Sequence, residues 1–185
     1  IPPVNLSQIT ARFDETPSYR HRGLCIEGAV SLEHVLACVE WCPKVGLNAF
    51  FLEFMLPYIF FDRWYRHELN PMLPPEPVAV DQVAVFMRTI EAEILRRGLV
   101  YHNPGHGWTC EPLGIPGLGW YASQYDLPAA TSSLLAEING KREIWTGIPL
   151  NTHLCYGNPA ARARVVDYAV RYALAKPDIE MLHVW

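Results

Sequence analysis

The chain reads RRGLVYHNPGHGWTCE from Arg96 to Glu111, and this stretch decides the predicted fold. Gly98 ends a helical pattern, and the apolar run that begins at Leu99 indicates a β-strand. The loop that follows holds histidine, tryptophan and glutamate within a few residues. In βα proteins, ligands bind beside the carboxyl ends of parallel strands. We therefore expect this loop to bind a sugar, with the aromatic face on its C–H face and the polar groups on its hydroxyls.

The segments on either side continue an alternation of strands and helices. Apolar residues repeat with helical spacing in the predicted helices, Ser31 and Asn158 are predicted N-caps, and the second strand is almost entirely apolar. The predicted elements are a strand at 23–27, a helix from 31 to 43, a strand at 47–54, an aromatic loop at 57–67, a helix at 81–98, a strand at 99–102, a helix at 128–138, an extended segment at 152–156, a helix at 159–175 and a strand at 181–185.

This order predicts a parallel sheet with helical crossovers. We interpret residues 1–21 as a lead-in and residues 22–185 as one α/β domain, the N-terminal half to two-thirds of a truncated (β/α)8 TIM barrel. A complete barrel needs roughly 250 residues, so part of it would lie beyond residue 185. The alternative is a complete, open, doubly wound sheet. The absence of a glycine-rich phosphate loop after the first strand disfavours it.

Composition excludes several classes of protein. Half of the 185 residues are hydrophobic and 18% are charged, which is typical of a folded domain. The net charge of −4 argues against a nucleic-acid partner, and no apolar run is long enough for a membrane helix. The five cysteines are odd in number and form no CxxC pair, which favours reduced thiols and, slightly, a cytoplasmic location. We expect no cofactor and no metal, because Pro104 and Gly105 prevent a helix that would pair His102 with His106.

Four short motifs resemble family 20 glycoside hydrolases of the β-N-acetylhexosaminidase type. In chain order they are Pro17, Tyr19 and Arg22-Gly23, then Asn48 after Gly46, then Pro104-Gly105-His106, and last Asn158-Pro159 with Lys176-Pro177 and Met181 to Trp185. The resemblance covers about residues 15–185. It implies a TIM barrel in which Arg22 and His106 bind the sugar.

The chain also departs from that family. Glu27 stands where the family has aspartate, Glu53 replaces a histidine, and the phrase from His106 to Glu111 is not a hexosaminidase sequence. It is more similar to an uncharacterised bacterial branch of the same group. The resemblance also places the catalytic general acid beyond residue 185. We therefore expect negligible glycosidase activity from these residues alone, since general acid catalysis contributes about 10²- to 10⁴-fold.

The candidate site residues follow the predicted strands. Glu53 and Glu111 are the candidate catalytic carboxyl groups, and we expect both to share one end of the sheet with Glu27 and His106. The remaining candidates for substrate binding are Arg22, Trp64, His102 and Trp108, with the two tryptophans as stacking platforms. A structural role is the alternative for each of them. We expect a glycoside hydrolase acting on an oligosaccharide or glycoside. The alternatives are a non-catalytic sugar-binding barrel module and a barrel enzyme with another small polar substrate.

Overall fold

The computed structural model describes residues 5, 7, 10, 12 and 14–185. The other residues of the predicted lead-in, 1–4, 6, 8, 9, 11 and 13, lie outside the described part, and residues 14–22 form no helix or strand. Within the described chain, no helix has both the length and the apolar character that a membrane span requires.

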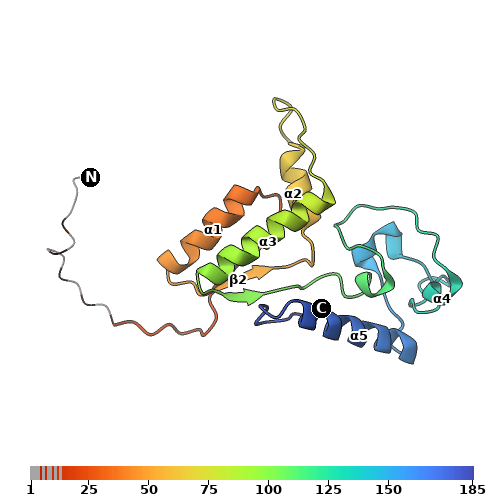
Figure 1. Cartoon of the computed structure of the whole chain (residues 1–185). Helices are drawn as coiled ribbons and strands as arrows, with labels where there is room; N and C mark the ends of the chain where they lie inside the picture. The colour runs from red at the N-terminus through yellow and green to blue at the C-terminus, as the bar shows by residue number, and fades with distance from the viewer. Residues whose placement is uncertain (1–4, 6, 8–9, 11, 13) are drawn as a thin grey trace.

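Three short parallel strands form the centre of the fold (Figure 1). They are β1 (Gly23–Ile26), β2 (Ala49–Leu52) and β3 (Val100–His102), in the order β1-β2-β3. The helices α1 (Leu32–Lys44) and α3 (Val80–Arg96) pack against each other and cover one face of the sheet. The remaining helices are α2 (Tyr58–Tyr65), α4 (Ala129–Ser132) and α5 (Pro159–Ala175), with short 3-10 turns at Glu111–Leu113, Trp145–Gly147 and Pro149–Asn151.

The predicted TIM barrel is wrong, because the sheet of the described chain is open and has only three strands. The alternation of strands and helices indicates parallel pairing, but it does not determine how many strands join the sheet. Of the two segments expected to extend the sheet, 152–156 contributes only an antiparallel bridge between Leu154 and Leu135. The segment 181–185 forms a single parallel bridge from Met181 to His102. The two crossover helices, α1 and α3, lie on the same face of this open sheet, whereas a doubly wound sheet has helices on both faces.

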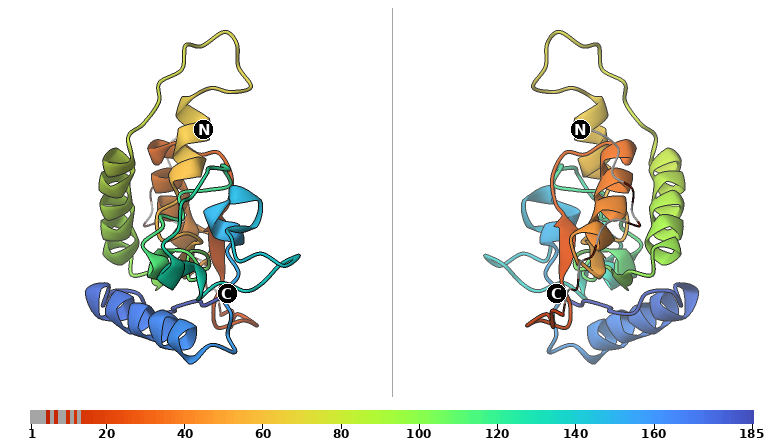
Figure 2. Two further views of the ribbon diagram at one scale, coloured as in Figure 1. Left: turned by 90° about the vertical axis from the view of Figure 1, so that its right-hand side faces the viewer. Right: turned by 90° about the vertical axis from the view of Figure 1, so that its left-hand side faces the viewer.

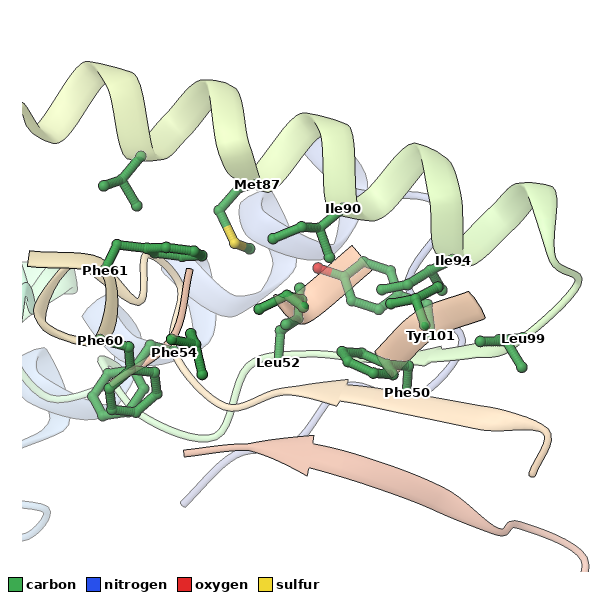
Figure 3. Packing of buried hydrophobic residues seen from close by; sticks show 14 of the residues in the cluster. Phe50, Leu52, Phe54, Phe60, Phe61, Met87, Ile90, Ile94, Leu99 and Tyr101 are labelled. Atoms are coloured by element: carbon green, nitrogen blue, oxygen red, sulfur yellow. The ribbon is translucent and has the colours of Figure 1, made fainter. Parts of the chain in front are cut away.

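The core lies between the sheet and α3. The buried side chains of α3, which are Val83, Met87, Ile90 and Ile94, recur every three or four residues and so form one stripe along the helix. Figure 3 shows Met87, Ile90 and Ile94 pointing from α3 toward Phe50, Leu52 and Tyr101 of the strands. The sequence patterns for these helices are confirmed, and so is the N-cap of α1, where the Ser31 side chain accepts a hydrogen bond from the backbone of His34.

Two predicted segments differ in the structure. Residues 57–67, expected as a loop, contain α2, because Ile59, Phe60 and Phe61 bury their side chains in the core. The helix expected at 128–138 stops at Ser132, and Leu135 then turns into its bridge with the 152–156 segment. Figure 2 shows α5, in blue, below α1 and α3 in both views.

One buried side chain joins β2, β3 and α5. Asn103 follows β3 and is fully buried. Its Nδ2 atom donates hydrogen bonds to the carbonyl oxygens of Leu52 and Phe54, at 2.6 and 3.0 Å. Its Oδ1 atom accepts a hydrogen bond from the Tyr172 hydroxyl at 2.6 Å. We call this arrangement the Asn103 clasp. Because both polar atoms of the side chain are hydrogen-bonded, its burial leaves no unsatisfied donor or acceptor.

Replacing Ile90 by alanine should lower the free energy of unfolding by about 2–5 kcal/mol, because the side chain is fully buried and the change leaves a cavity. Val85→Ala on the exposed side of the same helix is the matched control, with an expected change within about 0.5 kcal/mol. Urea titration of both variants measures this difference. Equal losses in the two variants would show that α3 does not pack as described.

Candidate functional site

The backbone brings the ends of β2 and β3 together at a polar rim. Glu53 follows β2, and its carbonyl oxygen accepts hydrogen bonds from the amides of Gly105 and His106 at 2.6 and 2.9 Å. A parallel bridge also joins Phe54 to His106. The loop after β3 is therefore held against the residues after β2, and its fixed backbone sets the position of the His106 ring.

The Glu53 side chain is buried at this rim, with only 5% of the residue exposed. Its Oε1 atom lies 3.3 Å from Nε2 of His106, which is half-buried. Its Oε2 atom is buried and, among the residues that the structure describes, has no hydrogen-bond partner. A buried carboxyl oxygen without a partner is costly in a folded protein and marks a position where a ligand can donate a hydrogen bond.

Burial moves the pKa values of these two groups toward each other. It raises the pKa of Glu53, and the charge of Glu27 raises that pKa further. Burial lowers the pKa of His106, although Glu27 opposes this shift. Both shifts favour the uncharged form of each group, so burial brings the proton affinities of this acid and this base closer together than in water. A pair of this kind is suited to proton transfer near neutral pH.

Aromatic rings enclose the imidazole of His106. The ring centroids of Phe54, Trp120 and Trp185 lie 5.1, 5.6 and 5.0 Å from that of His106. Both tryptophans meet the imidazole edge-on, and they remain 43% and 57% exposed respectively. The buried Glu53–His106 contact therefore lies beside two tryptophan rings that are partly exposed to solvent.

Close backbone packing places Trp120. The preceding segment lies on α2, where the amide of Ile59 donates a hydrogen bond to the Leu118 carbonyl at 3.0 Å. A Cβ atom on Gly119 would lie 2.5 Å from Cβ of Ile59, and φ at this glycine is +153°, so only glycine fits here. The Tyr121 hydroxyl then donates to the buried carboxylate of Asp62 at 3.2 Å. These contacts fix both neighbours of Trp120.

Glu27 supplies the second carboxylate of the rim. It follows β1 and is exposed. Ile26 pairs with Leu52 in parallel register, so Glu27 and Glu53 follow their strands at the same end of the sheet. The charge of Glu27 raises the pKa values of Glu53, His106 and Cys25. We call Glu27, Glu53, His106, Trp120 and Trp185 the rim site. Its first three members were predicted to lie together, and the structure brings them together.

Two residues of the predicted loop are structural instead. Trp108 was expected to stack on a sugar, but only 1% of it is exposed, and its Nε1 atom donates to the His183 carbonyl at 2.6 Å. Its ring packs edge-on against Tyr168 and Tyr172 of α5. Glu111 was expected to be catalytic, and its Oε1 atom accepts a hydrogen bond from the amide of Gly117 at 2.7 Å. Burial raises the pKa of the Glu111 carboxyl, which closes its own loop.

The other predicted residues lie outside the rim site. Arg22 precedes β1, at the opposite end of the sheet, and its Nε atom donates to the Gly46 carbonyl at 2.9 Å. Trp64 lies on α2 in a separate pocket of about 360 Å³, which no rim-site residue lines. His102 lies on the sheet face opposite the helices and contacts two other histidines, His21 and His183.

Sequence reasoning did not place Trp120 or Trp185 in the site. Trp120 follows Gly119 in a glycine-rich loop, a pattern that signals close backbone approach, but its contact with α2 is long-range. Trp185 reaches the site only because Met181 pairs with β3. In the described chain, no group of three or more histidine, cysteine, aspartate or glutamate side chains could hold a metal ion. All five cysteines are free thiols.

No family model and no curated protein sequence matches this chain.

Glu53→Gln should increase stability, and the gain should grow with pH. The folded-state pKa of Glu53 is raised above its unfolded value of about 4.3. Stability is therefore lost as pH rises from the unfolded to the folded pKa, because the unfolded chain releases the proton first. Glutamine cannot ionise and avoids this loss, which is about 1.4 kcal/mol for each unit of pKa shift. Urea unfolding of both proteins between about pH 4 and 8 measures the gain.

The control is Glu40→Gln. A hydrogen bond from Lys44 lowers the pKa of the exposed Glu40, so this variant should show the opposite trend with pH. A Glu53→Gln effect that does not change with pH would contradict the burial of an ionisable carboxyl group at this position.

Proposed function

We propose that the rim site binds a carbohydrate and that the chain belongs to an enzyme acting on glycosidic bonds. The observation that carries this proposal is the unpartnered Oε2 atom of Glu53, in a residue that contacts His106, together with the two partly exposed tryptophans around that histidine. A sugar hydroxyl can donate to that oxygen while the C–H face of the ring lies on Trp120 or Trp185. The proposal requires no barrel, because all five residues come from strand ends and loops of the open sheet.

The carboxyl groups support hydrolysis as the reaction. Most glycosidases use one carboxylic acid to protonate the leaving oxygen and a second carboxylate on the other side of the scissile bond. The raised pKa of Glu53 suits the acid, and His106 can return the proton to it. Glu27, exposed at the same rim, suits the second role. Glu111, tied to Gly117, takes neither role.

A panel of neutral oligosaccharides tests the binding claim through changes in tryptophan fluorescence. Trp120→Ala should weaken binding by about tenfold, since loss of an aromatic stacking partner costs about 0.5–1.5 kcal/mol beyond the area buried. Trp41→Ala on α1 removes a similarly exposed ring away from the rim and should leave affinity unchanged. Absence of binding to every neutral oligosaccharide at millimolar concentration would refute the proposal.

Hydrolysis of aryl glycosides tests the catalytic claim, and turnover by this chain would overturn the expectation that the general acid lies beyond residue 185. Glu53→Gln should retain sugar binding but lose about 10²- to 10⁴-fold in kcat, because it keeps the shape of the side chain without its acidic proton. Release of the aryl alcohol reports kcat, and fluorescence titration reports affinity. If the wild-type chain binds sugar with no turnover, the rim is a non-catalytic binding site.

A further inference from the structure

Three histidines from distant parts of the sequence form a hydrogen-bonded row on the sheet face away from α1 and α3. Nδ1 of His21 lies 3.3 Å from Nε2 of His102. Nδ1 of His102 lies 3.0 Å from Nε2 of His183. The ring of Phe51 from β2 contacts both His102 and His183. We call His21, His102 and His183 the histidine chain.

The histidine chain ends beside a wall of the rim site. His183 lies two residues before Trp185, and the ring centroids of these two residues are 6.4 Å apart. Backbone and indole hydrogen bonds hold the segment as far as His183, through Met181 and the Nε1 atom of Trp108. No backbone hydrogen bond in the described chain involves Val184 or Trp185. The position of Trp185 therefore depends on the rings around it.

The loop after β3 leaves space for this ring. A Cβ atom on Gly105 would lie 2.8 Å from the Trp185 indole, closer than real side chains approach. Trp185 also meets Phe51 edge-on with a centroid distance of 5.7 Å. The Trp185 ring thus packs directly on Gly105, and it also contacts the rings of His106, Phe51 and His183.

Counting protons shows how the row responds to acid. Each of its two links needs one hydrogen between two nitrogens, and each end of the row has one outward nitrogen. Three neutral rings carry three N–H groups, and one added proton still fits because the second outward nitrogen can hold it. A second added proton forces two N–H groups to face each other in one link. The row therefore loses a hydrogen bond once it holds two extra protons.

The surroundings determine which charges act on the row. Burial is the largest cause that lowers the pKa of His102, and the neighbouring His183 and His21 lower it further. The charge of Glu180 raises this pKa. Arg20 lines the same surface pocket as His21 and Glu180. On β1, Cys25 shares the sheet row with Phe51 and His102, and its pKa is raised to about 11, so it stays uncharged.

We propose that the histidine chain positions Trp185 and makes this wall of the rim site sensitive to pH. At neutral pH both links are made, His183 stays against the Phe51 ring, and Trp185 stays against His106. In acid the second extra proton repels His183 from His102, and Trp185 leaves its seat on Gly105. This proposal does not rest on carbohydrate binding, because the position of Trp185 can be measured without a ligand.

NMR of the ligand-free chain tests the proposed pH sensitivity through nuclear Overhauser contacts between the rings of Trp185 and His106. The Trp185→Phe variant assigns the signals of the Trp185 ring. The contacts should be present at about pH 7.5 and lost at about pH 5, on either side of the ordinary histidine pKa. His183→Gln should keep them at both values, because its amide can donate or accept without titrating. His153→Gln, at an exposed histidine outside the row, should behave as the wild type.

Two further variants guard against simple misfolding. His183→Ala should lose the contacts at both pH values. Gly105→Ala should also lose them at both, because the added methyl group takes the place of the indole while the histidine chain remains intact. Contacts that persist at pH 5 in the wild type would overturn the proposal. The proposal would also be overturned if acid removed the Trp185–His106 contacts from His183→Gln as fully as from the wild type.

Discussion

The Asn103 clasp is the interaction on which the rest of this structure depends. A three-stranded parallel sheet has few hydrogen bonds of its own, and β3 has only three residues. The Asn103 side chain bonds to two carbonyl groups around Glu53, at Leu52 and Phe54, and receives the Tyr172 hydroxyl of α5. Its backbone amide also donates to Met181, at 3.1 Å. One residue thus holds β2, α5 and the last segment of the chain in fixed positions.

The consequence of this constraint is a carboxyl group buried against a histidine. Because the ends of β2 and β3 cannot separate, Glu53 and His106 share a site from which water is largely excluded, and one carboxylate oxygen remains unpaired. Such an arrangement costs stability and persists where it serves a function. The tryptophans around it are held by contacts that also depend on glycine, at Gly105 and Gly119, where a Cβ atom would meet the Trp185 ring and Ile59.

Local elements could be predicted from the sequence because their signals are local. Ser31, Asn158 and the apolar stripe of α3 mark helices correctly. The position of Glu53 after an apolar strand correctly placed it at the same end of the sheet as His106, and the structure adds their contact. The number of strands could not be predicted, because each βα unit has the same pattern whether the sheet closes or stays open. Trp108 shows why binding residues are harder to predict from sequence. A tryptophan in a polar loop can bind a ligand or, as here, pack in the core against α5. Trp120 and Trp185 depend on long-range packing that no local pattern shows.

The central claim is that the Asn103 clasp holds His106 in a buried contact with Glu53, whose pKa is raised by the same burial. The pKa of the His106 imidazole, measured by NMR titration in the wild type and in Asn103→Ser, tests it most directly. The account predicts a wild-type value below the ordinary value of about 6.5, with a return toward that value when the clasp is shortened and water enters. A wild-type value above about 6.5 would contradict the account, since it would mean that His106 is charged and paired with an ionised carboxylate.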